Sequence, residues 1–208
     1  MKTKLRQITV ATLAALLCSC AATELKSTWK APDYRGGPVG KIAVLEEDDG
    51  VGYRPMFEGQ FVRQLEQQGQ PAFKSLDLLT LSEIQADKEA AADKLHAAGA
   101  DCVLIVRLVE RVNQSSLAAR NSGSTVTSDS GKFGWLEYST TSASRGRMEH
   151  SLKLHVYIET SLYQLDSGKK LWSGVTRTVL HEDTDRMAEI EPMVAKVLEA
   201  MRADGLIR

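Results

Sequence analysis

Asp101-Cys-Val-Leu-Ile-Val-Arg-Leu-Val-Glu110 is the most apolar strand-length stretch of this chain. Its residues 102–106 are apolar without interruption, which is typical of a strand covered on both faces at the centre of a parallel sheet. We therefore expect the fold to be built around this strand. Cys102 lies inside the apolar run, so a buried structural cysteine is favoured over a reactive thiol.

Two strand-and-helix units precede the central strand. Lys41-Ile-Ala-Val-Leu45 is an apolar run of strand length. Residues 54–68 follow with an apolar stripe at helical spacing, with Pro55 placed for the first turn and Gly69 placed to end the helix. The first unit is therefore predicted to be a strand followed by an amphipathic helix.

The second unit is less regular. Residues 71–79 are predicted to form a strand, and Ser82 with Gln85 three residues later has the pattern of a capping box that opens a helix. The inner stripe of this helix is Ile84, Ala91, Leu95 and Ala98, and Gly99 closes it. Right-handed crossovers would place the first strand between the other two in a parallel three-stranded unit.

The second half of the chain has a different pattern. Residues 113–132 are rich in Ser, Thr, Gly and Asn and predict a flexible loop. Residues 151–163 alternate between apolar and polar side chains, residues 166–169 form a turn, and residues 170–180 return as the partner strand carrying Trp172. The expected fold class is α/β (α+β), with a mixed sheet in which a βαβαβ parallel unit precedes an antiparallel meander and a C-terminal helix.

The C-terminal helix contains a proline. Apolar residues from Met187 to Met201 lie on one helical face, which predicts packing on the sheet. Pro192 lacks the backbone N–H that a helix interior needs. Either the helix kinks near Ala188, or the main helix begins at Glu191 after a separate turn.

The polar face of the alternating strand is a candidate binding surface. His155, Tyr157 and Tyr163 would point to the solvated side of the sheet, where they could contact a partner. An ordinary solvated sheet face explains the same pattern, so both interpretations stay open.

The N-terminus has the pattern of an export and lipid-attachment signal. A basic start is followed by a short apolar run that ends in Leu17-Cys-Ser-Cys20. This run is far shorter than the roughly 20 residues that span a bilayer. Leu17 and Ser19 fit the positions before a lipidated cysteine, so residues 1–19 are predicted to be a lipoprotein signal peptide and Cys20 the lipidation site. An ordinary secretory signal and a buried N-terminal helix are the alternatives.

The positions of proline and glycine indicate the domain organisation, and the charge balance bears on the partners. Residues 20–40 contain two prolines and a Gly-Gly pair and predict a lipidated tether, although Trp29 and Tyr34 suggest that its second half lies against the domain. Residues 41–208 would form a single domain.

With 26 basic and 27 acidic residues, the chain lacks the basic surface that nucleic acid requires. Membrane attachment would therefore come from the acyl chains on Cys20.

Three short motifs carry candidate chemistry. Residues 46–49, Glu-Glu-Asp-Asp, follow the first strand, where open α/β sheets tend to bind ligands, but a solvated acidic loop is favoured over a divalent cation site. Residues 181–185, His-Glu-Asp-Thr-Asp, contain metal-ligating types and also suit the cap of the last helix. Ser167 and Lys170 match the Ser-x-x-Lys of penicillin-interacting enzymes, but they lie in a turn. No catalytic residue, metal or cofactor is expected.

Several short motifs together produce a family resemblance. Cys20, Thr28-Trp-Lys30, the Phe-x-x-x-Phe-Val of residues 57–62 and Leu171-Trp-Ser-Gly174 resemble those of small uncharacterised bacterial envelope lipoproteins. The element order is similar to the periplasmic α/β domain of the Tol propeller protein, the curli secretion lipoprotein and the lipoprotein activators of peptidoglycan synthases. The resemblance implies a binding or assembly role in the envelope, although a shared fold does not assign function.

These observations lead to one functional expectation and two alternatives. The expectation is an outer-membrane lipoprotein, facing the periplasm, whose non-catalytic domain binds an envelope protein or cell-wall partner. Outer-membrane sorting is expected because residue 21 is Ala, where inner-membrane retention uses Asp. The alternatives are a lipoprotein that binds a small ligand or divalent metal, and a periplasmic hydrolase.

Overall fold

The computed structural model describes residues 23–47, 52–113, 153–181 and 186–208. The predicted signal peptide, Cys20, Asp48, Asp49 and all but the first residue of the predicted loop 113–132 lie outside these ranges. Residues 182–185, at the proposed cap of the last helix, also lie outside them.

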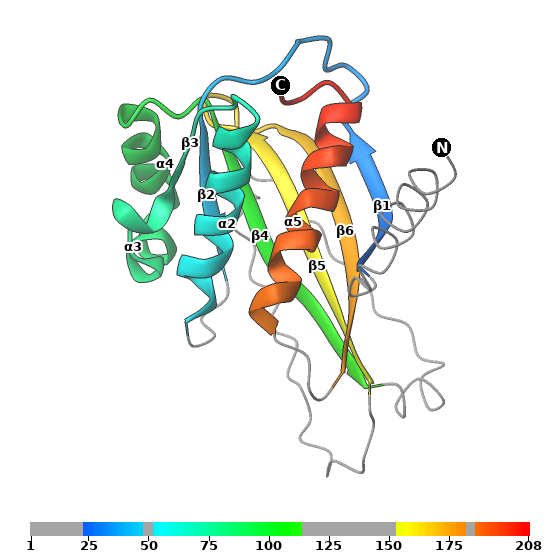
Figure 1. Ribbon diagram of the computed structural model, residues 1–208. Coiled ribbons are helices and arrows are strands. Elements are labelled where there is room, and N and C mark those ends of the chain that lie inside the picture. Colours follow the sequence, from blue (N-terminus) through cyan, green and yellow to red (C-terminus); the bar gives the residue numbers. More distant parts are fainter. Residues whose placement is uncertain (1–22, 48–51, 114–152, 182–185) are drawn as a thin grey trace, which may run out of the picture.

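The described residues form a six-stranded mixed sheet (Figure 1). Its strands are β1 Thr23–Lys30, β2 Ile42–Glu46, β3 Ala72–Lys74, β4 Cys102–Asn113, β5 Lys153–Gln164 and β6 Lys170–His181, in the spatial order β1-β6-β5-β4-β2-β3. β2 pairs in parallel with both β3 and β4, while β4, β5, β6 and β1 pair antiparallel. The predicted fold class is confirmed, and β2 lies between the other two parallel strands as expected.

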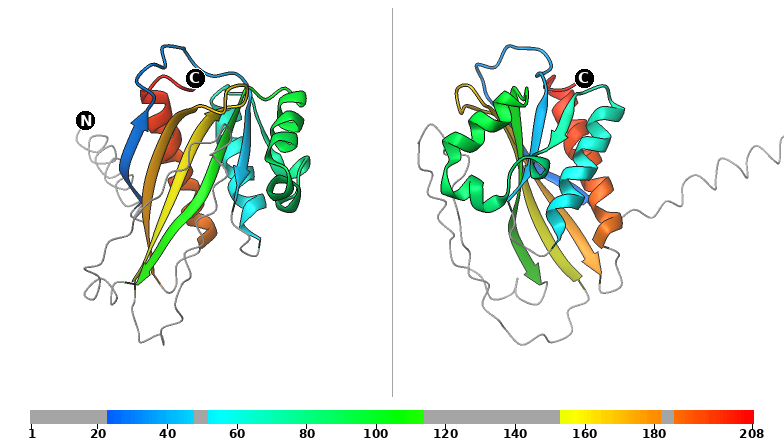
Figure 2. Two further views of the ribbon diagram at one scale, coloured as in Figure 1. Left: turned by 180° about the vertical axis from the view of Figure 1, so that it is seen from behind. Right: turned by 90° about the vertical axis from the view of Figure 1, so that its left-hand side faces the viewer.

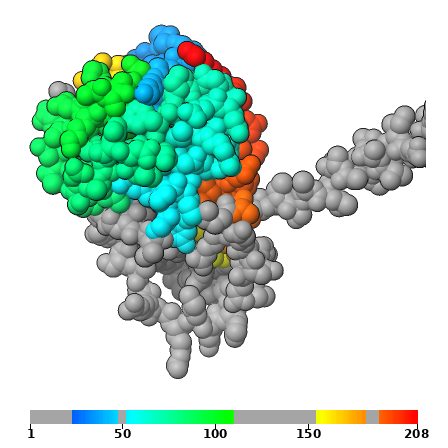
Figure 3. Space-filling model, turned by 60° about the vertical axis from the view of Figure 1, so that its left-hand side comes forward, coloured from blue at the N-terminus to red at the C-terminus, as the bar shows by residue number. Residues whose placement is uncertain are grey.

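Helices cover the two faces of the sheet unequally. Helices α2 (Tyr53–Gln67) and α5 (Arg186–Ala203) pack side by side on one face, whereas α3 (Leu81–Ala86) and α4 (Lys88–Ala97) lie on the other, beside β2 and β3 (Figure 2). Two apolar clusters correspond to these layers. The larger one joins α2 and α5 to the sheet, and the smaller one joins α3 and α4 to it. The space-filling view shows α2, α3 and α4 as a continuous surface with α5 beside them (Figure 3).

The central strand is buried as predicted. Cys102 and the four residues after it are all at most 2% exposed. Their side chains alternate between the two clusters, with Cys102 and Leu104 in the larger and Val103 and Ile105 in the smaller. Apolar cover on both faces therefore explains why this stretch has no polar residue.

The connection from β3 to β4 contains two helices, α3 and α4, where the sequence predicts a single helix. Thr80, not Ser82, forms the capping box: its side chain accepts from the backbone N–H of Glu83, and the Glu83 carboxylate accepts from the Thr80 N–H. The helix then ends, and Asp87 caps α4 by accepting from the N–H of Ala90. The predicted strand over residues 71–79 is also shorter, because a 3₁₀ turn begins at Ser75.

Helix α5 excludes one of the two alternatives for Pro192. It begins at Arg186 and includes Pro192, so a main helix that starts at Glu191 is excluded. Met193, Val194 and Val197 are fully buried in the larger cluster. Burial of this apolar face compensates for the hydrogen bond that the proline cannot make.

The predicted tether is wrong over residues 23–30, because they form β1 and pair with β6, with one bulge between Leu25 and Ser27. The chain after β1 also lies against the domain. Ala31 donates a backbone hydrogen bond to Leu171 over 2.9 Å, and Val39 donates one to Leu206 over 2.8 Å. Only Ala21 and Ala22 therefore separate Cys20 from the first strand of the sheet.

Trp172 anchors the face of β6 that packs under α5. Its side chain is fully buried, and a Cβ added at Gly174 would lie 2.4 Å from its ring. Gly174 is therefore required by the close approach of the indole to the strand. This contact gives a physical reason for the Leu-Trp-Ser-Gly sequence.

Candidate functional site

One face of the sheet is left without a described helix over most of its area. We call it the open face: the side of β1, β6, β5 and β4 that points away from α2 and α5 (Figure 2). The strand registers assign its residues to rows across the sheet. Its described side chains are Glu24, Ser27, Trp29, Arg107, His155, Tyr157, Glu159, Ser161, Ser173, Val175, Arg177 and Val179.

Ionic groups connect neighbouring strands on the open face. Arg107 on β4 contacts Glu47 at the end of β2, with Nε 2.8 Å from Oε2. Glu159 on β5 accepts from Ser161 Oγ at 3.1 Å and lies 3.8 Å from Lys170 Nζ on β6. These four charged residues, Glu47, Arg107, Glu159 and Lys170, form what we call the charged strip.

The environment of the charged strip perturbs two pKa values. Burial raises the pKa of the Glu47 carboxyl, and the nearby Arg107 opposes this effect without cancelling it. Burial acts to lower the pKa of Arg107, but the carboxylates of Glu47 and Glu159 outweigh it and raise the pKa. The guanidinium therefore stays charged, and its role is to stabilise carboxylates on both sides of it.

Aromatic side chains share the open face with the charged strip. Trp29 on β1 is 46% exposed, which is unusual for so large an apolar side chain. Tyr157 and His155 are half-buried on the open face, where the sequence alternation predicted them. Trp29 was missed as a site residue because it was assigned to a tether. Its place on the open face follows from its pairing with Ser173.

The prediction that Tyr163 lies on a solvated face is wrong. The alternation gave its side of the sheet correctly, but Tyr163 is only 8% exposed and belongs to the cluster under α3 and α4. Lys170 Nζ lies 5.4 Å from the centre of its ring. Tyr163 is therefore a core residue.

The carboxyl ends of β2 and β3 are filled by a buried ion pair. Glu58 on α2 is fully buried and receives Arg54 Nε at 2.7 Å, Ser75 Oγ at 2.9 Å and the backbone N–H of Leu76 at 2.9 Å. Arg54 also donates to Ser75 Oγ and to the carbonyl of Leu79. The protein's own groups thus occupy the position where a parallel sheet often binds a ligand. Sequence analysis missed this pair, although its i, i+4 spacing was a signal.

The predicted solvated acidic loop is wrong for its first two residues. Glu46 is 3% exposed, and Glu47 is half-buried against Arg107. In the part of the chain that the structure describes, no group of three or more His, Cys, Asp or Glu side chains is arranged to hold a metal. His96, which is exposed, contacts the carboxylate of Asp166 at 3.2 Å.

The candidate nucleophiles are placed for structure. Cys102 is buried, and burial, followed by the charges of Asp101 and Asp166, raises the pKa of its thiol to about 12. Ser167 lies in the turn between β5 and β6, where its hydroxyl donates to Gln164 Oε1. The ammonium of Lys170 is directed to Glu159 and not to Ser167. The Ser-x-x-Lys spacing therefore does not form a nucleophile and base here.

Comparisons with known proteins give distant structural likeness only. No family model and no curated protein matches the sequence. A PelC dodecamer from Paraburkholderia phytofirmans is 12% identical with a TM-score of 0.48, covering 89% of this chain and 99% of that one. Lipoprotein GNA1162 from Neisseria meningitidis is 17% identical with a TM-score of 0.43, covering 79% and 99%. The hypothetical protein CT253 from Chlamydia trachomatis is 9% identical with a TM-score of 0.41, covering 79% and 94%.

At these identities and TM-scores the likeness carries no argument about function. Within the described ranges, no helix has the length and apolar character needed to cross a membrane.

Proposed function

We propose that this chain is a lipid-anchored protein of the bacterial envelope, and that its domain holds an envelope partner on the open face without bond-making chemistry. The observation that carries the proposal is the combination of the exposed Trp29, the half-buried Tyr157 and the charged strip on one sheet face. Aromatic side chains surrounded by paired charges are typical of surfaces that bind proteins.

The pairing of the ionic groups favours binding over catalysis. A general acid or base needs a titratable group that can reach a substrate. Glu47 is held by Arg107, and Glu24 accepts from Nη2 of Arg177 at 2.7 Å. The charged groups of such pairs can also contact opposite charges on another protein. Contacts of this kind determine the orientation of the bound protein and the rate of association more than the affinity.

The cellular localisation in this proposal is inferred from the sequence. Leu17-Cys-Ser-Cys20 follows a basic and apolar leader, so Cys20 is the proposed lipidation site. Ala21 favours transfer to the outer membrane, with the domain facing the periplasm. A partner in this compartment is an envelope protein or the cell wall, and the balanced charges of the open face favour a protein over an anionic polymer.

Site-specific photo-crosslinking in intact bacterial envelopes tests the binding surface. A photo-reactive residue at Trp29 or Tyr157 should capture the same partner, whereas one at Glu66, which is exposed on α2, should capture none. The purified Tyr157→Ala protein should keep the melting temperature of the unmodified protein and lose the captured species. Equal capture at Glu66 would contradict the proposal.

Two further measurements separate the parts of the proposal. Mass spectrometry of the N-terminal peptide should show an acylated Cys20, and an unmodified Cys20 would end the lipid-anchor interpretation. If the purified protein hydrolysed an ester or a cell-wall substrate, the non-catalytic interpretation would have to be abandoned.

A further inference from the structure

The connection between the lipidation site and the sheet is too short to act as a tether. Cys20 and Thr23, the first residue of β1, are three residues apart. A fully extended chain spans at most about 3.6 Å per residue, so their Cα atoms lie within about 11 Å of each other. If Cys20 carries the acyl chains, as the proposed function requires, the beginning of β1 must lie at the headgroups of the bilayer.

The pairing of β1 identifies which end of the sheet is near the lipid. Thr23 Oγ1 and Thr178 Oγ1 share a hydrogen bond of 2.9 Å, so β1 begins beside the last residues of β6. The next rows of the sheet pair His155 with Val179 and Leu154 with Leu180. We call Thr23, Leu154, His155, Val179 and Leu180 the anchor end.

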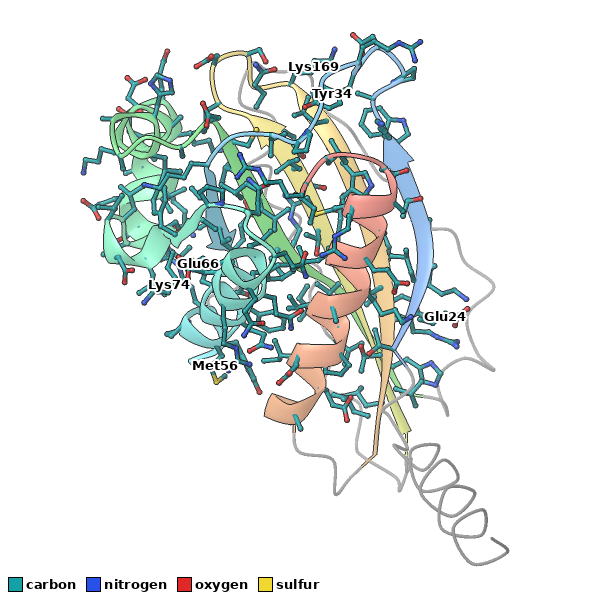
Figure 4. The ribbon with its side chains drawn as sticks, turned by 45° about the horizontal axis from the view of Figure 1, so that its top comes forward. Glu24, Tyr34, Met56, Glu66, Lys74 and Lys169 are labelled. Carbon is teal, nitrogen blue, oxygen red and sulfur yellow. The ribbon has the colours of Figure 1, made fainter. Side chains whose placement is uncertain are left out.

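The opposite end of the same strands is about 23 Å away, because Lys30 is seven residues beyond Thr23. It contains the β5–β6 turn and the segment after β1. Figure 4 shows Lys169 and Tyr34 together at this end, whereas Glu24 lies far from them along β1. We call residues 30–35 and 166–170 the distal end.

The two ends differ in the kind of side chain they present. The anchor end has half-buried apolar side chains, Leu154, Val179 and Leu180, and charged residues lie beside them: Lys153 precedes Leu154, and the ion pair of Glu24 with Arg177 lies in the adjoining rows. The distal end carries formal charges, among them the exposed ion pair between Asp33 and Lys169. Lys30, Asp166 and Lys170 add to this charge. Half-exposed apolar side chains are stabilised in the interfacial region of a bilayer, whereas charges favour water.

From the short connection and this polarity we propose that the domain stands directly on the bilayer. The anchor end contacts the lipid headgroups, and the charged distal end points away from the membrane. The binding partner of the anchor end is therefore the lipid surface itself. The part of the open face beyond the anchor end, with Trp29, Tyr157 and the charged strip, is then available to the proposed partner. His155 lies at the border with the lipid.

Fluorescence quenching in vesicles tests this orientation. The lipidated protein would be reconstituted in phosphatidylethanolamine and phosphatidylglycerol vesicles that contain a lipid with a quencher on its headgroup. Single cysteines would be placed at Glu24, Val179 and Lys169 and labelled with one fluorophore, because the buried Cys102 should not react. Glu24 is the near reference. Its replacement removes its ion pairs with Lys26 and Arg177, and that of Lys169 removes the ion pair with Asp33.

Quenching at Val179 should match that at Glu24 and be several-fold stronger than at Lys169. A flexible Gly/Ser insertion of about 20 residues between Ala22 and Thr23, with a root-mean-square span of about 25 Å, should reduce quenching at both near positions while Cys20 stays acylated.

The outcomes separate this inference from the proposed function. Quenching at Lys169 equal to that at Val179 would show that the sheet lies flat on the membrane, and weak quenching at Val179 beside strong quenching at Glu24 would show that the anchor end stays away from the lipid. Either result would overturn the orientation and leave the anchor intact. A chain without acyl groups on Cys20 would overturn the lipid-anchor proposal instead.

Discussion

The indole Nε1 of Trp172 donates a hydrogen bond to Oδ2 of Asp204 over 2.8 Å. Trp172 lies on β6, and Asp204 is the first residue after α5. The backbone carbonyl of Asp204 also accepts from Lys30 Nζ at the end of β1. Asp204, one residue beyond the last helix, therefore fixes that helix to β6 and β1, the two neighbouring strands at one edge of the sheet.

Asp204→Ala should lower the free energy of unfolding by about 1–3 kcal/mol, because the buried indole N–H would lose its charged acceptor. Chemical denaturation would measure the loss. Trp172→Phe removes the donor, so Asp204→Ala should cost less in that background. Equal costs in both backgrounds would show that the hydrogen bond contributes nothing to stability.

Arg54→Met should destabilise the fold far more than the loss of a surface cation does. It would leave the fully buried Glu58 carboxylate without its counter-charge, which costs about 3–5 kcal/mol. The matched control is Lys196→Met, which breaks the exposed Lys196–Glu199 pair on α5 and should change the free energy of unfolding by about 0.5 kcal/mol or less. Chemical denaturation of both variants would measure the difference.

The double variant Arg54→Met with Glu58→Leu tests the reason for that loss. It removes both charges, so it should recover much of the stability that Arg54→Met alone loses. If the double variant were as unstable as the sum of the two single changes, the cost would come from packing and not from an unpaired charge.

The capping box of α3 predicts a pH-dependent stability. The backbone N–H and then the hydroxyl of Thr80, followed by Lys94, lower the pKa of Glu83 from 4.5 to about 2. Because the folded-state pKa is depressed, the stabilisation is fully present above the ordinary pKa and is lost as the pH falls through the folded-state value. Glu83→Gln should therefore lower the melting temperature at neutral pH, and the difference from the unmodified protein should shrink under acid conditions.

Glu66→Gln is the control for this experiment, because it removes the same charge from an exposed helical position. Its effect on the melting temperature should be smaller at neutral pH and change less with acid. A Glu83→Gln effect that did not depend on pH would assign the loss to the helix and not to the carboxylate.

Cys102 should be protected from thiol reagents in the folded protein. Burial raises the pKa of its thiol to about 12 and leaves its side chain almost without access to solvent. In the mature lipidated protein, modification of Cys102 should therefore follow the rate of unfolding. Ser167→Cys adds a thiol in the exposed β5–β6 turn, which should react at once. Rapid modification of both thiols in that variant would show that the central strand opens locally.

Local patterns were enough to predict the centre of the fold. The apolar run at Cys102, the helical stripe ending at Gly69 and the alternation of β5 each depend on neighbours close in sequence. Gly69 adopts φ 75°, as a residue that ends a helix should. These features combine into the correct mixed sheet because crossover handedness leaves few other arrangements.

The errors occurred where distant contacts decide the structure. Thr23–Lys30 contains few apolar residues and becomes a strand only through pairing with β6. Tyr163 alternates like a solvated residue and is buried because it packs in the cluster under α3 and α4. Glu58 has the appearance of a surface carboxylate, and only the approach of Ser75 and Leu76 makes it a buried acceptor. No local pattern contains this information.

The position of β1 has a consequence for the order in which the chain matures. Thr23 is 155 residues from the Thr178 that it contacts, so β1 has no partner strand until almost the entire polypeptide has emerged. On the proposed route of export, the amino end crosses first and stays extended for that whole interval. The processing enzymes can therefore reach Cys20 before the sheet is complete. The earliest strand to be synthesised is then joined to the sheet only after β6, and acylation can precede the closure of the fold.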